Sequence, residues 1–279
     1  MIQLYNEVSF RISKIVTQSY STSFSIAVGF LNPENRDAIY SIYGFVRLAD
    51  EIVDSFHEYN KQLLLQNFER DYYDALENGI SLNPVLNSFQ QTVRKYKIYD
   101  DLIQAFLKSM KTDLLKSDHI TKSETDDYIY GSAEVVGLMC LKVFVNGEEA
   151  LFDELKEPAR RLGAAFQKVN FLRDIKNDMQ NLNRKYFHNT VNREFDETAK
   201  EEIVNDIIAD FEFSLTGLKK LPQNSKLGVL IAYYYYLNLL KKIRKTPALE
   251  LLDRRIRVKD SVKFLILLRA IIVTKLNLI

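Results

Sequence analysis

The stretch from residue 167 to residue 178 reads Gln167-Lys-Val-Asn170-Phe-Leu-Arg173-Asp174-Ile-Lys-Asn-Asp178. Its polar residues at positions 167, 170, 174 and 178 follow the i, i+3, i+7, i+11 spacing that places side chains on one face of an α-helix. Such a face is normally apolar, and inward-facing polar groups are costly unless a partner or ligand satisfies them. The stretch therefore predicts a helix that carries two carboxylates, Asp174 and Asp178, on a functional face.

A second stretch carries the same arrangement and reads Tyr43-Gly-Phe-Val-Arg47-Leu-Ala-Asp50-Glu-Ile-Val-Asp54. Again an arginine precedes two aspartates that lie four residues apart on one helix face. Paired carboxylates on two facing helices suit a hard cation such as magnesium, which prefers a few carboxylates completed by water and substrate phosphate. The metal ligands expected from both stretches are Asp50, Asp54, Asn170, Asp174 and Asp178.

A third pair, Asp206 and Asp210, provides a control within the same chain. No arginine precedes it within one helical turn, and its surroundings are acidic. Most aspartate pairs with this spacing lie on solvated helix faces. We therefore expect this pair to lie at the surface.

Composition limits the class of protein. The 279 residues are 47% hydrophobic and carry a net charge of +1, which argues against a nucleic-acid surface. Only nine glycines and five prolines interrupt the sequence, so we expect one all-helical domain that spans residues 1–279. The single cysteine and the absence of a signal-peptide pattern favour a cytoplasmic location.

Local signals predict where the helices lie. Asn32-Pro33, Asn83-Pro84 and Thr246-Pro247 each place a capping residue before a proline suited to the first helical turn. Hydrophobic periodicity predicts an all-α fold with helices over residues 3–18, 33–56, 60–78, 84–95, 99–116, 124–145, 148–181, 196–216, 223–244 and 260–277.

The run from residue 262 to residue 279 is rich in leucine and isoleucine. Lys263, Arg269 and Lys275 recur every six residues and point to three sides of a helix, which argues against a membrane span. Two interpretations stay open: a final helix docked on the core, or a basic helix at a membrane surface.

Four ordered segments resemble the squalene and phytoene synthase family. They are residues 21–24 with 36–54, residues 128–139, residues 163–178 with 183–187, and residues 254–258. Several ordered motifs are far more specific than one aspartate pair. Four positions depart from the family pattern. Glu51 stands where aspartate is common, Glu134 where a small glycine is usual, Asn177 where an acid is usual, and Gly131 where several members carry a tyrosine.

The resemblance implies an isoprenoid-synthase-type helical bundle around a central hydrophobic cavity. It also implies head-to-head joining of two identical prenyl diphosphates through a cyclopropyl diphosphate intermediate. Within the family, we expect a bacterial-type phytoene synthase that joins two geranylgeranyl diphosphates in carotenoid biosynthesis. The alternatives are dehydrosqualene or squalene formation from two farnesyl diphosphates.

Spacing assigns some candidate roles, and the resemblance implies the others, among them the roles of Ser21, Ser23, Arg184, Lys185 and Arg255. The catalytic set is Asp50, Asp54, Asp174, Asp178, Tyr43 and Arg47. The planar guanidinium groups of Arg47 and Arg173 suit phosphate oxygens, with a plain ion pair within the helix as the alternative. Aromatic faces stabilise a carbocation, and Phe24, Tyr43 and Tyr130 are the candidates for this role. The full substrate-binding set is Ser21, Ser23, Phe24, Tyr43, Arg47, Tyr130, Gln167, Asn170, Arg173, Arg184, Lys185, Tyr186 and Arg255.

Expected cofactors and partners follow from the resemblance. Two or three Mg²⁺ ions are expected in each site, and NADPH is not, although squalene synthases also lack a glycine-rich nucleotide motif. Expected partners are the prenyl diphosphate, the inner face of the membrane as a peripheral contact, and a desaturase that acts downstream.

Three other classes of protein agree less well with these sequence features. A head-to-tail prenyltransferase or terpene cyclase also uses aspartate-rich helices, but the former usually has denser aspartate runs. A non-catalytic assembly subunit is expected to have lost one carboxylate pair, and both pairs are present here. A di-iron bundle needs Glu-x-x-His pairs, which the sequence lacks.

Overall fold

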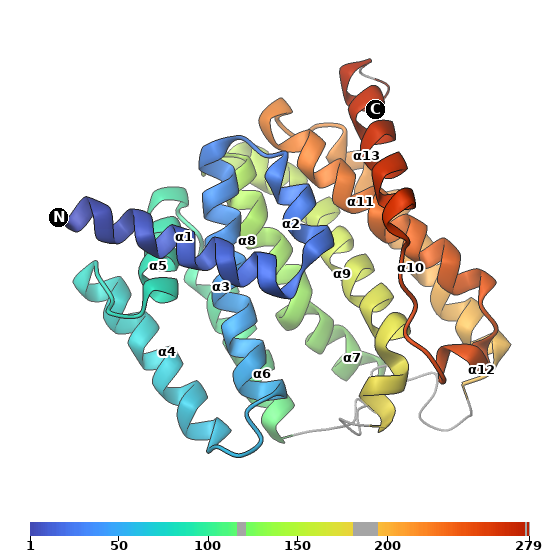
Figure 1. The fold of residues 1–279 in the computed structure, drawn as a ribbon, viewed down its shortest axis with the longest axis horizontal. Helices are drawn as coiled ribbons and strands as arrows, with labels where there is room; N and C mark the ends of the chain where they lie inside the picture. Colours follow the sequence, from blue (N-terminus) through green and yellow to red (C-terminus); the bar gives the residue numbers. More distant parts are fainter. Residues whose placement is uncertain (116–120, 181–194, 277, 279) are drawn as a thin grey trace.

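The computed structural model describes residues 1–115, 121–180, 195–276 and 278. Every regular element within these ranges is helical, as predicted (Figure 1). The elements are α1 Ile2–Tyr20, α2 Thr22–Gly29, α3 Pro33–Asp54, α4 Lys61–Asn78, α5 Pro84–Tyr96, α6 Asp100–Leu115, α7 Lys122–Ile129, η1 Tyr130–Glu134, α8 Val135–Phe144, α9 Glu149–Gln180, α10 Glu197–Leu218, α11 Gln223–Lys245, α12 Ala248–Leu251 and α13 Asp260–Lys275.

Two of the three predicted caps are confirmed. The side chains of Asn32 and Asn83 accept backbone N–H groups at the starts of α3 and α5. The third expectation was wrong, because Thr246 ends α11 and its hydroxyl donates to the Lys242 carbonyl. Its Oγ1 is therefore engaged in the preceding helix and does not cap α12.

Two short helices, α2 and α12, were not predicted. The first follows α1 after a break at Ser21, where the backbone is extended and the side chain accepts the Phe24 N–H at 3.4 Å. The second spans four residues. Helices this short contain too few turns to give a periodic apolar signal.

The single helix expected over residues 124–145 is divided by the π-helical turn η1. Gly131 in this turn lies against α6, since an added Cβ would stand 2.9 Å from the Ala105 carbonyl oxygen. A π-helical turn re-aims the side chains around it and often occurs at functional sites. Tyr130 and Ser132 thereby leave the regular helical register.

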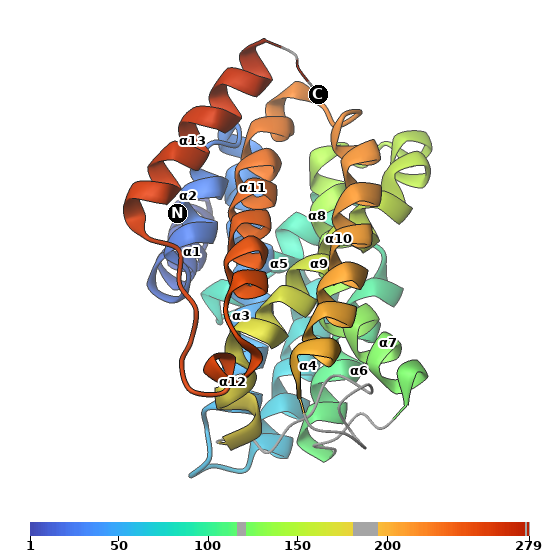
Figure 2. The ribbon, with the colours of Figure 1, turned by 90° about the vertical axis from the view of Figure 1, so that its right-hand side faces the viewer.

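The aspartate-bearing helices α3 and α9 do not pack closely on each other. Within the described residues, α8 packs against both of them. Gly137 lets α8 approach α9, because an added Cβ would stand 3.0 Å from the Ala159 carbonyl oxygen. Gly163 lets α9 approach η1, because an added Cβ would meet the Ala133 carbonyl oxygen at 2.7 Å. The carboxyl ends of α3 and α9 lie at the same end of the bundle, the lower end in Figures 1 and 2.

A buried aromatic cluster holds α3 in place. Phe45 stacks on Phe89 of α5, with ring centroids 4.0 Å apart, and also contacts Phe68, Tyr72 and Phe106. Aromatic pairs at these distances contribute beyond their buried area. The cluster leaves the opposite face of α3, which carries Tyr43, Arg47, Asp50 and Asp54, only half-buried.

None of the described helices combines the length and the apolar character needed to cross a bilayer.

Candidate active site

Asp174 is held between two arginines at the carboxyl end of α9. The Arg173 Nε lies 3.1 Å from both Asp174 oxygens, and the Arg255 Nε lies 2.6 Å from Oδ1. Arg255 reaches this carboxylate from the segment between α12 and α13, far along the chain. The structure thus brings two predicted site residues, Arg173 and Arg255, to the half-buried carboxylate of a third, Asp174.

Arg47 occupies the corresponding place on α3. It pairs with Glu51 one turn later and lies over the ring of Tyr20, with 4.3 Å between its Cζ and the ring centroid. Among the described residues its buried Nε has no hydrogen-bond partner. A buried donor without an acceptor is costly, so this position suits an anionic oxygen from a ligand.

Aromatic side chains lie beside the polar faces of both α3 and α9, and they are called the aromatic bridge. Tyr43 stacks on Phe24 of α2, with centroids 5.1 Å apart, and lies within electrostatic reach of Tyr236 on α11. The Tyr236 hydroxyl donates to Asn170 Oδ1 of α9 at 3.3 Å, and its ring stacks on Phe166. Burial raises the pKa of Tyr43 to about 12 and also raises that of Tyr236, so both hydroxyls stay protonated near neutral pH.

Sequence reasoning missed Tyr236. Four consecutive tyrosines, residues 233–236, wrap around a helix and do not reveal which of them faces a site. In the structure Tyr233 and Tyr234 are buried, whereas Tyr236 contacts the predicted ligand Asn170. Only the position of α11 beside α9 supplies this information.

The structure describes some of the remaining predicted residues and leaves others outside its described part. The Gln167 amide donates to the Ser132 hydroxyl at 3.4 Å, which joins α9 to η1. Ser21 caps α2, and Ser23 is half-buried on the same helix. The side chain of Asp178 and the residues Arg184, Lys185 and Tyr186 lie outside the described part of the structure.

The donor set suits a hard metal ion with a diphosphate. Asp50, Asp54 and Asp174 offer half-buried carboxylates at one end of the bundle, and the arginines offer donors for phosphate oxygens. The described side chains contain no ready-made group of three or more His, Cys, Asp or Glu residues that could hold a metal. The metal ligand set therefore stays a prediction.

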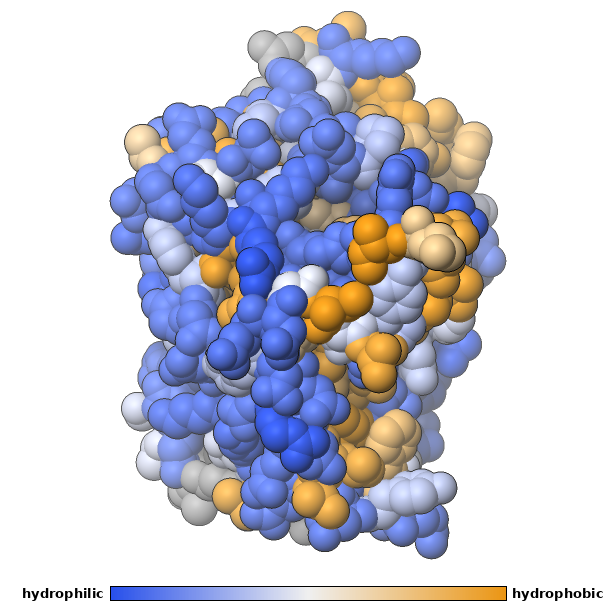
Figure 3. Space-filling model, turned by 90° about the vertical axis from the view of Figure 1, so that its left-hand side faces the viewer, coloured by the Kyte–Doolittle hydropathy of each residue, from blue (hydrophilic) through white to orange (hydrophobic). Residues whose placement is uncertain are grey.

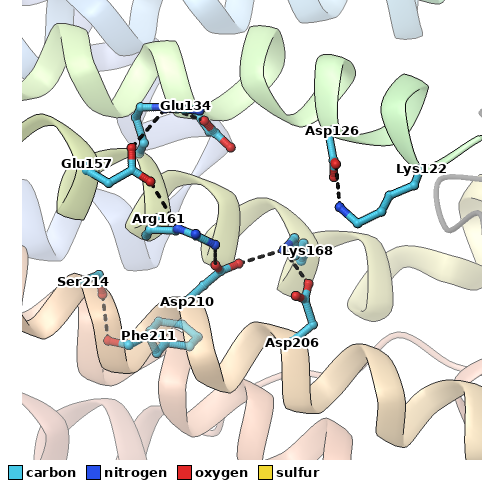
Figure 4. A network of polar contacts seen from close by, with 11 residues as sticks. Lys122, Asp126, Glu134, Glu157, Arg161, Lys168, Asp206, Asp210, Phe211 and Ser214 are labelled. Carbon is cyan, nitrogen blue, oxygen red and sulfur yellow. Dashed lines mark hydrogen bonds and ion pairs between the residues drawn. The ribbon is translucent and has the colours of Figure 1, made fainter.

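The third aspartate pair corrects an expectation. Asp206 is exposed, but Asp210 is 1% exposed and lies in a charge network between α9 and α10. Figure 4 shows Arg161 and Lys168 of α9 pointing to Asp210, at distances of 2.9 and 2.7 Å. The surface interpretation was wrong for Asp210 because its two cationic partners come from another helix.

Comparison with known proteins identifies the family. The sequence profile described as squalene/phytoene synthase matches residues 17–261. The chain belongs to the squalene/phytoene synthase family. Members of this family are prenyltransferases that condense prenyl diphosphates head to head, and this chain is such an enzyme.

Three similarities describe its place in the squalene/phytoene synthase family. The chain is 24% identical to a 4,4'-diapophytoene synthase of Staphylococcus haemolyticus over 86% of this chain and 88% of that protein. It is 30% identical to the chloroplastic phytoene synthase 2 of Zea mays over 58% of this chain and 41% of that protein. A dehydrosqualene synthase crystal structure shares the fold, with a TM-score of 0.82, 22% identity and 98% coverage of both chains.

Glu134, which departs from the usual pattern of the squalene/phytoene synthase family, has a structural explanation. Its carboxylate accepts from the Arg160 Nε at 2.8 Å, and Arg160 also pairs with Glu157 at 3.0 Å. The Arg160 guanidinium lies 5.4 Å from the ring centroid of Tyr130. Burial raises the pKa of the Glu134 carboxyl, and the Arg160 charge offsets part of that effect.

Proposed function

We propose that the protein joins two geranylgeranyl diphosphates head to head to form phytoene. The reaction passes through a cyclopropyl diphosphate intermediate, releases two diphosphates and ends with loss of a proton. Similarity to a plant phytoene synthase supports the choice of product. Arginine–carboxylate pairs on α3 (Arg47 with Glu51) and on α9 (Arg173 with Asp174) support a reaction of diphosphates, and the carboxyl ends of both helices lie at one end of the bundle.

Two observations carry this proposal: the buried Arg47 Nε has no hydrogen-bond partner among the described residues, and Asp174 is paired with two arginines. A diphosphate supplies the acceptor that Arg47 lacks. It also offers oxygens to Arg173 and Arg255, which frees the Asp174 carboxylate to act as a ligand. Arg255 suits this exchange because its side chain is about half exposed.

We assign Mg²⁺ binding to Asp50, Asp54, Asn170, Asp174 and Asp178, with two or three ions in each site. The bound ions would neutralise the leaving diphosphate as Lewis acids. The chain itself positions the ligands, and Tyr236 orients the Asn170 amide by donating to its oxygen.

The aromatic side chains of the bridge have a different task. After ionisation, the allylic cation must be kept away from water, and aromatic faces attract a desolvated cation by about 2 kcal/mol. Phe24, Tyr43 and Tyr130 were predicted for this role, and Tyr236 joins them because it stacks within the same region. The protonated hydroxyls of Tyr43 and Tyr236 cannot act as anionic bases near neutral pH.

A second substrate, farnesyl diphosphate, is favoured by one specific observation. The similarity to a diapophytoene synthase extends over 86% of this chain, further than the similarity to the maize enzyme. The chemistry at the diphosphate end is the same for both substrates. Only the length of the apolar chain that is accommodated differs.

Incubating the purified protein with Mg²⁺ and either diphosphate, with and without NADPH, tests the proposal. We expect phytoene from geranylgeranyl diphosphate, without a requirement for NADPH and with complete loss of product after chelation. Dehydrosqualene from farnesyl diphosphate alone would establish the second substrate. Squalene that forms only with NADPH would overturn the proposed product.

A further inference from the structure

The outward side of α13 is an uncovered apolar surface. Phe264, Leu265, Leu268, Ile272 and Leu276 are 41 to 63% exposed, and these five residues are called the α13 apolar face. At 100° per residue they occupy one continuous arc of the helix. The opposite side holds the buried residues Ile266 and Ala270 and packs on α11.

The charges around the α13 apolar face have one sign. Arg269 and Lys275 are exposed beside it, whereas residues 261–276 contain no acidic side chain. The acid of α13, Asp260, lies at its first turn and pairs with Lys263 at 2.9 Å. The charged end of Arg269 lies over the ring of Tyr234, with 4.5 Å between its Cζ and the ring centroid.

The surface extends beyond one helix. In Figure 2, α13 and the amino-terminal helix α1 lie on the same side of the molecule, the left-hand side of that view. Figure 3 shows hydrophobic side chains gathering towards the corresponding edge, on the right of its view. Helix α1 also carries exposed apolar side chains, namely Ile2, Leu4 and Ile15.

We propose that the α13 apolar face binds the surface of an anionic lipid bilayer. Apolar side chains flanked by lysine and arginine, on a helix too polar to cross, are typical of a helix that lies in the interfacial plane. Lipid headgroups supply the negative charge that residues 261–276 lack. A second copy of the chain fits less well, because it would bring the same cations to the interface without an acidic counterpart.

The benefit of this surface rests on the proposed function. The product of the reaction is a hydrocarbon without any polar group, so transfer through water is unfavourable. An enzyme seated on the bilayer allows such a product to reach the acyl chains directly.

Sedimentation with lipid vesicles tests the surface. The protein is mixed with vesicles of phosphatidylcholine alone or of phosphatidylcholine with phosphatidylglycerol. We expect binding to the anionic vesicles that falls roughly tenfold or more in the double variant Leu265→Asp/Ile272→Asp, since both changes place charge in the lipid interface. Lys275→Glu should cause a smaller loss and a weaker dependence on salt.

Leu82→Asp is the matched control, because Leu82 is 95% exposed in the connection between α4 and α5. It should bind vesicles like the unmodified protein, and equal melting temperatures should show that all variants fold. Absence of binding to anionic vesicles, or an equal loss in Leu82→Asp, would overturn the proposal. So would a dimer in analytical ultracentrifugation that the double variant converts to monomer.

Vesicle binding and catalysis are measured separately. Activity on prenyl diphosphates solubilised in detergent does not require a bilayer. A protein that binds vesicles but turns over no prenyl diphosphate would contradict the proposed function and leave the surface intact. The reverse result would contradict the surface alone.

Discussion

Asp174 and Asp210 are each held by two cationic side chains, yet their surroundings differ. Asp210 is 1% exposed, and both of its partners, Arg161 and Lys168, come from the regular helix α9. Asp174 is 21% exposed, and one of its partners, Arg255, lies on the segment that precedes α13 and is 54% exposed.

This difference determines what each carboxylate can do. Asp210 is itself buried, and removing a cation from beside it leaves an uncompensated charge in a low-dielectric region, so Lys168, which is 14% exposed, cannot readily exchange. Solvent reaches Asp174 and Arg255, and a ligand can replace their contact at little cost. The ion pairs of Asp210 therefore stabilise the contact between α9 and α10, whereas those of Asp174 can be exchanged for contacts with a ligand.

The largest effect should come from Asp174→Asn, with Asp50→Asn as its counterpart on α3. Each change removes a negative charge required for metal and diphosphate binding, and turnover should fall about a thousandfold. The melting temperature should change little, because both side chains are partly exposed. Steady-state kinetics and thermal unfolding measure the two effects, and near-normal turnover in either variant would remove that residue from the site.

Asp210→Asn should show the opposite pattern. It leaves Lys168, which is 14% exposed, with a partly unpaired charge, and should lower the free energy of unfolding by about 3 kcal/mol. Urea denaturation measures this loss. Turnover per folded molecule should stay normal below the transition, and a selective loss of turnover would mean that Asp210 also supports catalysis.

Glu134→Gln should change how stability depends on pH. The pKa of Glu134 is raised in the folded state, so the folded protein binds the proton more tightly than the unfolded chain. Stability should therefore decline as the pH rises from the ordinary glutamate value near 4.5 through the raised value. The variant should lack this decline in denaturation experiments across that range, and an identical pH profile would contradict the assigned direction.

Asp206→Asn should have the smallest effect. Asp206 is 60% exposed and shares Lys168 with Asp210, so its loss should alter the free energy of unfolding by no more than about 0.5 kcal/mol. Turnover should be unchanged. A destabilisation equal to that of Asp210→Asn would mean that exposure does not separate the two aspartates of this pair.

The local pattern of the sequence determined most of the helices and the two helix faces that carry the aspartate pairs. Helical periodicity and capping act within a few residues, so Asn32 and Asn83 predicted where α3 and α5 begin, and residues 167–178 predicted the site-bearing part of α9. The short helices α2 and α12 escaped detection because they contain too few turns to show a period.

Only the tertiary structure decided which groups meet. Asp210 is buried because two cations of α9 reach it, Glu134 is satisfied by Arg160, and Tyr236 joins the site because α11 lies beside α9. Arg255 likewise reaches Asp174 only after the chain returns past α12. These contacts join residues far apart in the sequence, and their partners follow from helix packing, which no local period encodes.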